Sequence, residues 1–332
     1  MRAGISYTMS SIGQPLVSVI IPAWNAEKWI AESLSSVIAQ TWSNLEIIVV
    51  DDGSTDHTAI IISDNFPSVR YIYQNHAGLP TARNRGVAES DGDFLAFLDS
   101  DDLWLPGKIE AQMLILLSEP KISLVFCDYE PFGLKSETTA GFDRGPILKT
   151  LPTKEIEKNG KIIVARDTLT PLLKDQFCQI PSCWLVKRED FDRINGFDIT
   201  LRTGAEDWLF AIQLANIGLF AFDTRKLARR REHTGSHSRN NNLFISFAKA
   251  IKRLIAEEKI FPKEFITAAK RQFAYSCLYI GQTVEAPAKT KIHWLILATR
   301  YASSLSIKDI LYIYSRAVFG IIAAKLIPSF LN

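Results

Sequence analysis

The sequence has 332 residues, of which 47% are hydrophobic, and this composition indicates a globular protein with one large domain and a smaller second part. The formal net charge is only +2, but residues 243–332 carry 13 Lys or Arg against 5 Asp or Glu, a net charge of +8. Four cysteines without CxxC spacing exclude a disulfide scaffold and favour a reducing cytosol. Residues 1–15 contain no apolar run typical of a secretory signal, so we expect a flexible segment there.

From Val17 onward, short apolar runs alternate with stretches that favour helices. This alternation predicts an α/β fold with a parallel sheet covered by helices on both faces. The runs predict strands at residues 17–21, 45–50, 69–73, 94–98 and 122–126, and later at 182–187. Helices are predicted at residues 27–39, 55–65, 79–90, 108–117 and 206–216.

Three parts follow along the chain: the segment 1–15, an α/β domain over residues 16–242, and a helical region over residues 243–332. Within the domain, residues 130–160 are rich in Pro, Gly and charged residues and predict an irregular insertion. Long loops of this kind often serve as substrate lids. We therefore expect donor specificity to lie in residues 130–179.

Polar residues follow the ends of the first four predicted strands. In a parallel sheet these ends lie along one edge, which is where α/β folds bind ligands. The sequence therefore predicts a binding crevice at this edge. Its expected lining is Trp24, Asn25, Asp51, Asp52, Gln74, Asn75 and the cluster from Asp99 to Asp102.

Three carboxylates, Asp99, Asp101 and Asp102, follow the apolar end of the fourth predicted strand. An unpaired charge beside a core is costly, so a positive group should neutralise them. Mg²⁺ and Mn²⁺ take oxygen ligands from protein carboxylates and nucleotide phosphates together. The cluster thus indicates a divalent cation and a phosphate-bearing substrate, and the alternative is a set of helix caps and solvated turns.

Five motifs taken together resemble the family 2 glycosyltransferases of bacterial surface-polysaccharide synthesis. They occur in the family's order and are VSVIIPAWN (17–25), VDDGSTD (50–56), GLPTARNRG (78–86), the DXD-type DSDD (99–102) and EDW (206–208). The resemblance implies the GT-A fold over residues 16–242, a Rossmann-like domain with a mostly parallel sheet that binds a nucleotide sugar. It also implies Mn²⁺ or Mg²⁺ as a cofactor.

The resemblance implies a donor site along the strand ends. Asp52 would accept a hydrogen bond from the ring N–H of uracil, and Trp24 would stack on the base. Alternatively, Asp52 caps a helix, Trp24 is a core residue, and Arg83 ties down an acidic loop. The implied donor-binding residues are Pro22, Ala23, Trp24, Glu27, Asp52, Asn75, Arg83, Asp99, Ser100, Asp101 and Glu206.

The resemblance makes Asp207 the general base that takes the proton of the acceptor hydroxyl, with Glu206 beside it. An ordinary Asp has a pKa near 3.9, so proton transfer would have to accompany bond formation. The alternative is that both acids simply favour the first turn of a helix. Asp101 is the implied metal ligand, and His233 is a candidate for a second one.

A basic run at residues 225–231 precedes His233. It contains no aromatic residues, and an acidic crevice is predicted nearby, so we do not expect nucleic acid as a partner. The resemblance places this run in a flexible loop that closes over the pyrophosphate. His57, His76 and His293 are expected to be ordinary surface or packed side chains.

Residues 310–327 form an apolar stretch that is interrupted by Arg316 and Lys325 and is marginal for a membrane span. With the net charge of the region, it favours docking on the anionic inner face of the cell membrane by a cytoplasmic, peripheral protein. The alternative is packing against the catalytic domain or against a second copy in a homo-oligomer.

These observations predict an inverting hexosyl- or N-acetylhexosaminyltransferase with a UDP-sugar donor and a glycan or lipid-linked acceptor. Inversion is expected because the motifs supply one base and no second carboxylate nucleophile. One alternative is a sugar nucleotidyltransferase, which should carry a Gly-rich basic loop after the first strand instead of Pro22-Ala-Trp-Asn25. The other is a non-catalytic nucleotide-sugar-binding protein.

Overall fold

The computed structural model describes residues 13–133, 153–155, 162–165, 167–174, 180–233, 243–283 and 288–301. Three expectations therefore lie wholly or mostly outside the described residues. They are the flexible segment at residues 1–15, the insertion at residues 130–160 and the apolar stretch at residues 310–327.

The first half of the domain alternates strands and helices as the apolar pattern predicts. The strand β1 is typical, because all seven residues of Val17–Ala23 are buried. The elements are β1 (Val17–Ala23), α1 (Ile30–Ile38), β2 (Leu45–Asp51), α2 (Thr58–Asn65), β3 (Arg70–Tyr73), α3 (Leu79–Ala88), β4 (Phe94–Phe97), β5 (Leu103–Trp104), α4 (Lys108–Ser118) and β6 (Ile122–Gly133).

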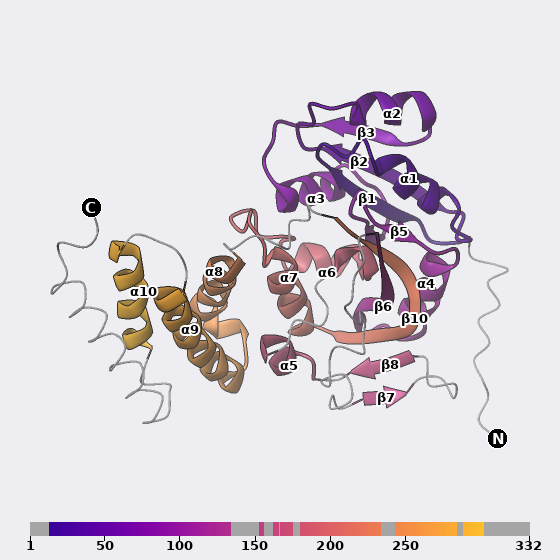
Figure 1. The fold of residues 1–332 in the computed structure, drawn as a ribbon. Coiled ribbons are helices and arrows are strands. Elements are labelled where there is room, and N and C mark those ends of the chain that lie inside the picture. Colours follow the sequence, from indigo (N-terminus) through magenta and orange to yellow (C-terminus); the bar gives the residue numbers. More distant parts are fainter. Residues whose placement is uncertain are drawn as a thin grey trace, which may run out of the picture.

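The second half adds strands to the same sheet and ends in helices (Figure 1). Its strands are β7 (Thr153–Glu155), β8 (Ile162–Ala165), β9 (Trp184–Lys187) and β10 (Leu219–Glu232). Its helices are α5 (Leu169–Lys174), α6 (Arg188–Arg193), α7 (Glu206–Ala215), α8 (Leu243–Ala256), α9 (Lys263–Thr283) and α10 (Ala288–Arg300), with short 3-10 turns at Pro181–Cys183 and Glu258–Ile260.

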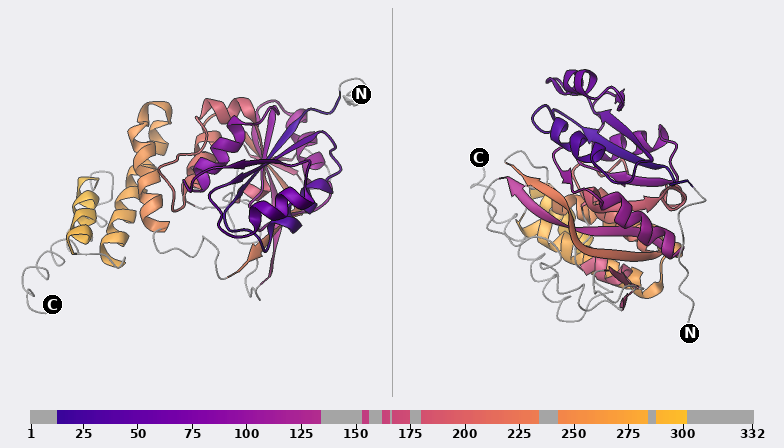
Figure 2. Two further views of the ribbon diagram at one scale, coloured as in Figure 1. Left: turned by 90° about the horizontal axis from the view of Figure 1, so that it is seen from above. Right: turned by 90° about the vertical axis from the view of Figure 1, so that its right-hand side faces the viewer.

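The described strands form one mixed sheet in the order β3-β2-β1-β4-β9-β6-β10-β8-β7, with β5 paired to β10. Strands β1, β2, β3 and β4 pair in parallel, and so do β6 and β10. The strand β9 is antiparallel to both of its neighbours, β4 and β6. The mostly parallel α/β fold is confirmed, with helices flanking the sheet (Figure 2).

The basic run at residues 225–231 is part of β10 and not of a flexible loop, so that expectation is wrong. This half of β10 pairs with residues 128–133 of β6. The guanidinium groups of Arg229 and Arg231 lie over the ring of Phe132, at 4.5 Å and 4.4 Å from its centroid. Arginine can occupy such a strand because its stem and planar head pack on an aromatic face.

An aromatic cluster fixes α7 beneath the sheet. The rings of Phe197 and Phe210 stack at 4.2 Å, and Trp184 of β9 stacks on Phe210 at 5.5 Å. Phe97 of β4 meets the same cluster edge-on. Because these rings bury large areas, they hold the start of α7, which carries Glu206 and Asp207, close to the end of β4.

The helices α8, α9 and α10 lie together beyond α7, on the left in Figure 1. The ring of Trp208 in α7 packs edge-on against Phe247 of α8, with centroids 5.3 Å apart. Helix α9 packs along both α8 and α10. Among the described helices, none is both long enough and apolar enough to cross a membrane.

Candidate active site

The strands β1, β2 and β4 run in parallel, so their C-terminal ends share one edge of the sheet. Trp24 follows β1, Asp52 follows β2, and Asp99 to Asp102 follow β4. The predicted crevice residues therefore come from neighbouring strands, as the sequence pattern requires. The contacts of each side chain separate this edge into three parts.

The first part surrounds Asp52, which is 4% exposed. Its Oδ1 accepts hydrogen bonds from Gln74 Nε2 at 2.7 Å and from the backbone N–H of Ala77 at 2.8 Å. Its Oδ2 accepts from the backbone N–H of Gly78 at 2.9 Å and lies 3.0 Å from Nδ1 of His76. Asp52 thus holds the loop after β3 and does not cap the helix α2.

Two neighbours of Asp52, Gly53 and Asp51, also have fixed positions in this turn. Gly53 has φ +82°, and a Cβ there would lie 3.0 Å from the backbone nitrogen of His76, so the turn requires glycine. Asp51 accepts from the Tyr71 hydroxyl at 2.7 Å and from the Ser54 N–H at 2.7 Å. The Asp-Asp-Gly-Ser motif is therefore a rigid turn whose two carboxylates point to different partners.

Trp24 is 48% exposed, so the alternative of a core tryptophan is wrong. Its ring lies 4.9 Å from that of His76, tilted by 35°. An exposed indole beside the Asp52 turn presents a flat face on which a base can stack. Asn75 is also exposed here, whereas Pro22 and Ala23 are buried in β1.

Glu27 lies between this turn and the start of α2. Its Oε2 is 2.8 Å from Nδ1 of His57 and accepts from the His57 backbone N–H at 3.1 Å. These hydrogen bonds lower the pKa of the Glu27 carboxyl below its ordinary value. Glu27 therefore ties the loop after β1 to α2, and its proposed donor contact stays a prediction.

The second part is an ion cluster around Arg83 of α3, whose side chain is 1% exposed. Its Nη2 donates to Asp99 Oδ1 at 2.7 Å, and its Nη1 donates to Glu206 Oε1 at 3.0 Å. Burial alone would lower the pKa of the guanidinium, but these two carboxylates raise it above its ordinary value. In this structure Arg83 joins two acidic loops, which is the alternative that the sequence left open.

The third part pairs Asp101 with His233, which follows β10 directly. Oδ2 of Asp101 lies 2.9 Å from Nε2 of His233, and both side chains are about one quarter exposed, at 28% and 26%. Burial and the nearby Asp99 carboxylate raise the pKa of Asp101, although His233 acts in the opposite direction. The backbone of Ser100 is fixed separately, because its carbonyl accepts from Ser33 Oγ at 2.8 Å.

A helix cap was the alternative that the sequence left open for Asp102, but Asp102 does not cap the following helix. It is 3% exposed, and it accepts from Ser182 Oγ at 2.7 Å and from the backbone N–H of Arg231 at 2.9 Å. Ser182 Oγ also accepts from the Asp99 N–H at 3.1 Å. Asp102 is thus a buried link between the β4 loop, the turn before β9, and β10.

Arg231 is a residue that the sequence reading missed. Its Nε donates to the carbonyl of Asp101 at 2.9 Å, and its Nη2 pairs with Glu32 at 2.6 Å. The guanidinium lies between two rings, 4.3 Å from the centroid of Trp29 and 4.4 Å from that of Phe132. The run of basic residues before His233 was visible in the sequence, but its pairing with β6 was not.

Asp207 lies in the first turn of α7 and accepts from the backbone N–H of Trp208 at 2.7 Å. Burial, and then the neighbouring Glu206 carboxylate, raise the pKa of Asp207 to about 8, while Arg83 acts in the opposite direction. The expected pKa near 3.9 is therefore wrong for this group. A carboxyl with a raised pKa is a stronger base than an ordinary one.

The side chains of Asp101 and His233 fit a divalent cation that takes its remaining ligands from the phosphates of a nucleotide. Within the described residues, no group of three or more His, Cys, Asp or Glu side chains could hold a metal ion. One carboxylate and one imidazole at 2.9 Å, beside the repelling carboxylate of Asp99, are nevertheless suited to a cation. Mg²⁺ and Mn²⁺ are commonly held by one or two protein ligands together with phosphate oxygens.

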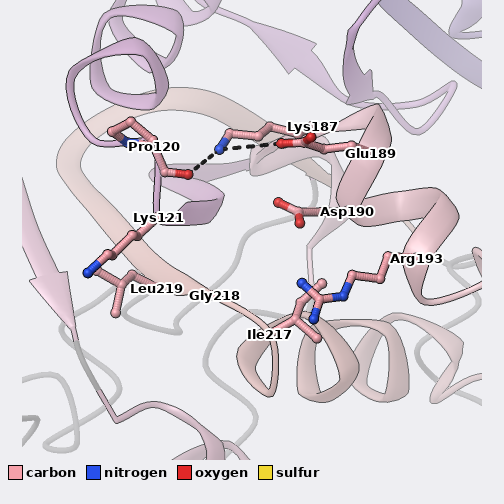
Figure 3. A pocket seen from close by; sticks show the side chains of 9 residues that line it. All are labelled: Pro120, Lys121, Lys187, Glu189, Asp190, Arg193, Ile217, Gly218 and Leu219. Atoms are coloured by element: carbon pink, nitrogen blue, oxygen red, sulfur yellow. Dashed lines mark hydrogen bonds and ion pairs between the residues drawn. The ribbon is translucent and has the colours of Figure 1, made fainter.

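A pocket of about 560 Å³ lies elsewhere (Figure 3). It lies where β6 and β10 begin and β9 ends, which is the opposite edge of the sheet from the predicted crevice. Its lining mixes both charges, from Lys121, Lys187, Glu189, Asp190 and Arg193. This pocket is therefore separate from the site described above.

Comparison with known proteins decides the family. The profile for "Glycosyl transferase family 2" matches residues 18–194. This chain belongs to glycosyl transferase family 2. An uncharacterized glycosyltransferase of Rickettsia typhi is 40% identical over 220 residues, which cover 66% of this chain and 64% of that protein. The chain thus spans slightly less than two thirds of the length of this relative.

A family member named for its activity is also similar over a shorter range. It is the UDP-Glc:alpha-D-GlcNAc-diphosphoundecaprenol beta-1,3-glucosyltransferase WfgD of Escherichia coli, 40% identical over 117 residues, or 35% of this chain and 46% of that protein. Among solved structures, S. aureus TarS 1-349 in complex with UDP-GlcNAc has a TM-score of 0.66 to this chain at 17% sequence identity. The match covers 92% of this chain and 88% of the TarS chain. At this identity the likeness concerns the fold.

Proposed function

We propose that this family 2 glycosyltransferase is a metal-assisted, inverting enzyme that transfers a sugar from a UDP-sugar to a hydroxyl of a glycan or lipid-linked acceptor. The observation that carries the proposal is the Arg83 cluster. One buried guanidinium joins Asp99 to Glu206. Asp99 lies two residues before Asp101, and Glu206 directly precedes Asp207. The carboxylates expected to meet the donor and the expected base therefore belong to one connected site.

The nucleoside would bind at the first part of the site. Trp24 presents its ring to the base, and the ring N–H of a uracil would have to replace one of the four groups that now contact the buried Asp52 carboxylate. WfgD is named for a UDP-glucose donor and the TarS structure is a complex with UDP-GlcNAc, which supports this donor class. A sugar nucleotidyltransferase is disfavoured, because the loop after β1 lacks a Gly-rich basic sequence.

Asp207 would take the proton of the acceptor hydroxyl as that oxygen bonds to the anomeric carbon. Its raised pKa reduces the mismatch between the base and a sugar hydroxyl, which is a much weaker acid, and the ionised form that accepts the proton increases as the pH rises towards about 8. Glu206, held by Arg83, would bind the donor sugar or the acceptor. Among the described residues of the site, the proposal assigns one base and gives no carboxylate the role of nucleophile, which is consistent with direct displacement and inversion.

Asp101 and His233 would hold the metal ion. When bound, the cation would stabilise the negative charge that develops on the departing nucleoside diphosphate. Arg231 would keep the Asp101 loop in place through its bond to the Asp101 carbonyl. A solved mannosyltransferase of Pyrobaculum calidifontis with GDP-Man and Mn²⁺, with a TM-score of 0.52 at 18% identity, supports a metal in this fold.

The test is a panel of UDP- and GDP-sugars with Mn²⁺ or EDTA, with release of nucleoside diphosphate as the readout. Wild type should turn over at least one UDP-sugar only in the presence of the metal. Asp101→Ala and Asp207→Asn should each lower turnover by at least about a hundredfold. Undiminished turnover in both variants would reject the assigned roles, and binding without any turnover would favour the non-catalytic alternative.

The acceptor and the location at a membrane surface belong to the same proposal. The name of WfgD includes a diphosphoundecaprenol acceptor. Residues 302–332 contain the apolar stretch at residues 310–327 together with the basic Lys308, Arg316 and Lys325 against one acid, Asp309. Flotation with vesicles containing anionic lipid should recover the full chain but not a chain that ends at Tyr301. Ending at Tyr301 retains α8, which packs against α7, so the truncated chain keeps its described helices. Equal recovery of the two chains would exclude residues 302–332 as the docking segment.

A further inference from the structure

The helix α8 packs directly against the loop that leads into α7. Oγ of Ser246 lies 2.6 Å from Oγ1 of Thr203, and Ser246 is 1% exposed. Cδ1 of Leu243 lies only 2.6 Å from the point where a Cβ on Gly204 would be placed. The side chains of Leu243 and Ser246 are one turn apart on α8, so a single face of the helix makes both contacts.

The same face of α8 reaches the two ends of this loop. Nε of Arg253 pairs with Oδ2 of Asp198 at 3.1 Å. At the other end, Phe247 packs edge-on against Trp208, the residue after Asp207. Contacts from α8 thus reach the loop at Asp198, Thr203 and Gly204, and reach α7 itself at Trp208.

The loop needs this support because its backbone is unfavourable. Gly204 has φ +118°, and Ala205 follows with φ +68°, a conformation that costs energy for a residue with a Cβ. The carbonyl of Ala205 accepts the hydrogen bond from Leu209 N–H at 3.0 Å that begins α7. The conformation at Ala205 therefore sets where the first turn, with Glu206 and Asp207, begins.

We infer that α8 is a positioning element of the active site. Its residues Leu243 and Ser246 hold Gly204 and Ala205 at positive φ and thereby aim Asp207 at the acceptor. This inference rests on the proposed function, because it gives α8 control over the general base of that reaction. Leu243 and Ser246 act through this loop, and the proposal gives neither of them a contact with the substrate.

The test compares Ser246→Ala with Ser123→Ala in the full chain. Ser123 is also 1% exposed and hydrogen-bonded through its hydroxyl, to the Leu214 carbonyl at 3.3 Å, but it lies at the opposite edge of the sheet. With UDP-glucose or UDP-GlcNAc and Mn²⁺, Ser246→Ala should lower kcat about tenfold while KM for the donor changes less than about twofold. The pH dependence of kcat should also change in Ser246→Ala and stay unchanged in Ser123→Ala.

Hydrogen exchange gives a readout that does not need the substrate. The Leu209 amide should exchange about tenfold faster in Ser246→Ala, because the start of α7 is released, and at the wild-type rate in Ser123→Ala. Unchanged exchange would overturn the inference whatever the activity. If Asp207→Asn is inactive and Ser246→Ala has normal kcat, the inference alone fails; if Asp207→Asn retains full turnover, the proposed function fails.

Discussion

The raised pKa of Asp207 predicts that Asp207→Asn makes the protein more stable while it abolishes transfer. The folded-state pKa is about 8, against an ordinary value of 3.8. Between these two values the folded chain binds a proton at Asp207 that the unfolded chain does not. The contribution of this group to stability is therefore complete below about pH 4 and declines as the pH rises towards 8.

The size of the effect follows from about 1.4 kcal/mol for each pKa unit. Removing the ionisable group should stabilise the fold by at most about 4 kcal/mol at pH 7 and about 1.5 kcal/mol at pH 5. Asparagine keeps an oxygen that can accept from the Trp208 N–H, so the helix start should not change. The gain should consequently increase with pH between these two values.

The assay is denaturant unfolding of wild type and Asp207→Asn at pH 5 and pH 7. The matched control is Asp192→Asn, at an exposed position of α6, which should change the free energy of unfolding by less than about 0.5 kcal/mol at either pH. A variant that is no more stable than wild type, or a gain that does not depend on pH, would refute the reasoning about burial.

Three further predictions concern the other parts of the site. Trp24→Ala should weaken UDP binding by about 1 to 3 kcal/mol in calorimetry, and Trp24→Phe should restore most of it; equal affinities would exclude stacking. Arg83→Met should lower the free energy of unfolding by about 3 to 5 kcal/mol, because it leaves the carboxylates of Asp99 and Glu206 without their shared guanidinium. An unchanged midpoint of denaturant unfolding would contradict this. His233→Ala should raise the Mn²⁺ concentration needed for half-maximal turnover, whereas the same requirement as wild type would remove His233 from the metal site.

The sequence by itself determined the α/β architecture and the edge at which the polar residues gather. Strand and helix periodicity are local properties, so the elements from β1 to α4, apart from the unpredicted two-residue strand β5, begin and end within a few residues of the expected positions. Motif order likewise indicated the family before any contact was known. The exposure of Trp24 and the role of Asp102 were left open, because they depend on what packs beside them.

Only the tertiary structure decided which of these groups meet. Arg83 lies 123 positions before Glu206 along the chain, and Arg231 lies 130 positions after Asp101, yet both pairs are in hydrogen-bond contact. The family resemblance placed the basic residues of β10 in a loop, and only their pairing with β6 makes them a strand. Burial raises the pKa of Asp207, and contacts from α8 hold the loop before it. Burial, charge pairing and loop conformation depend on side chains that lie far apart in sequence, so local pattern cannot fix them.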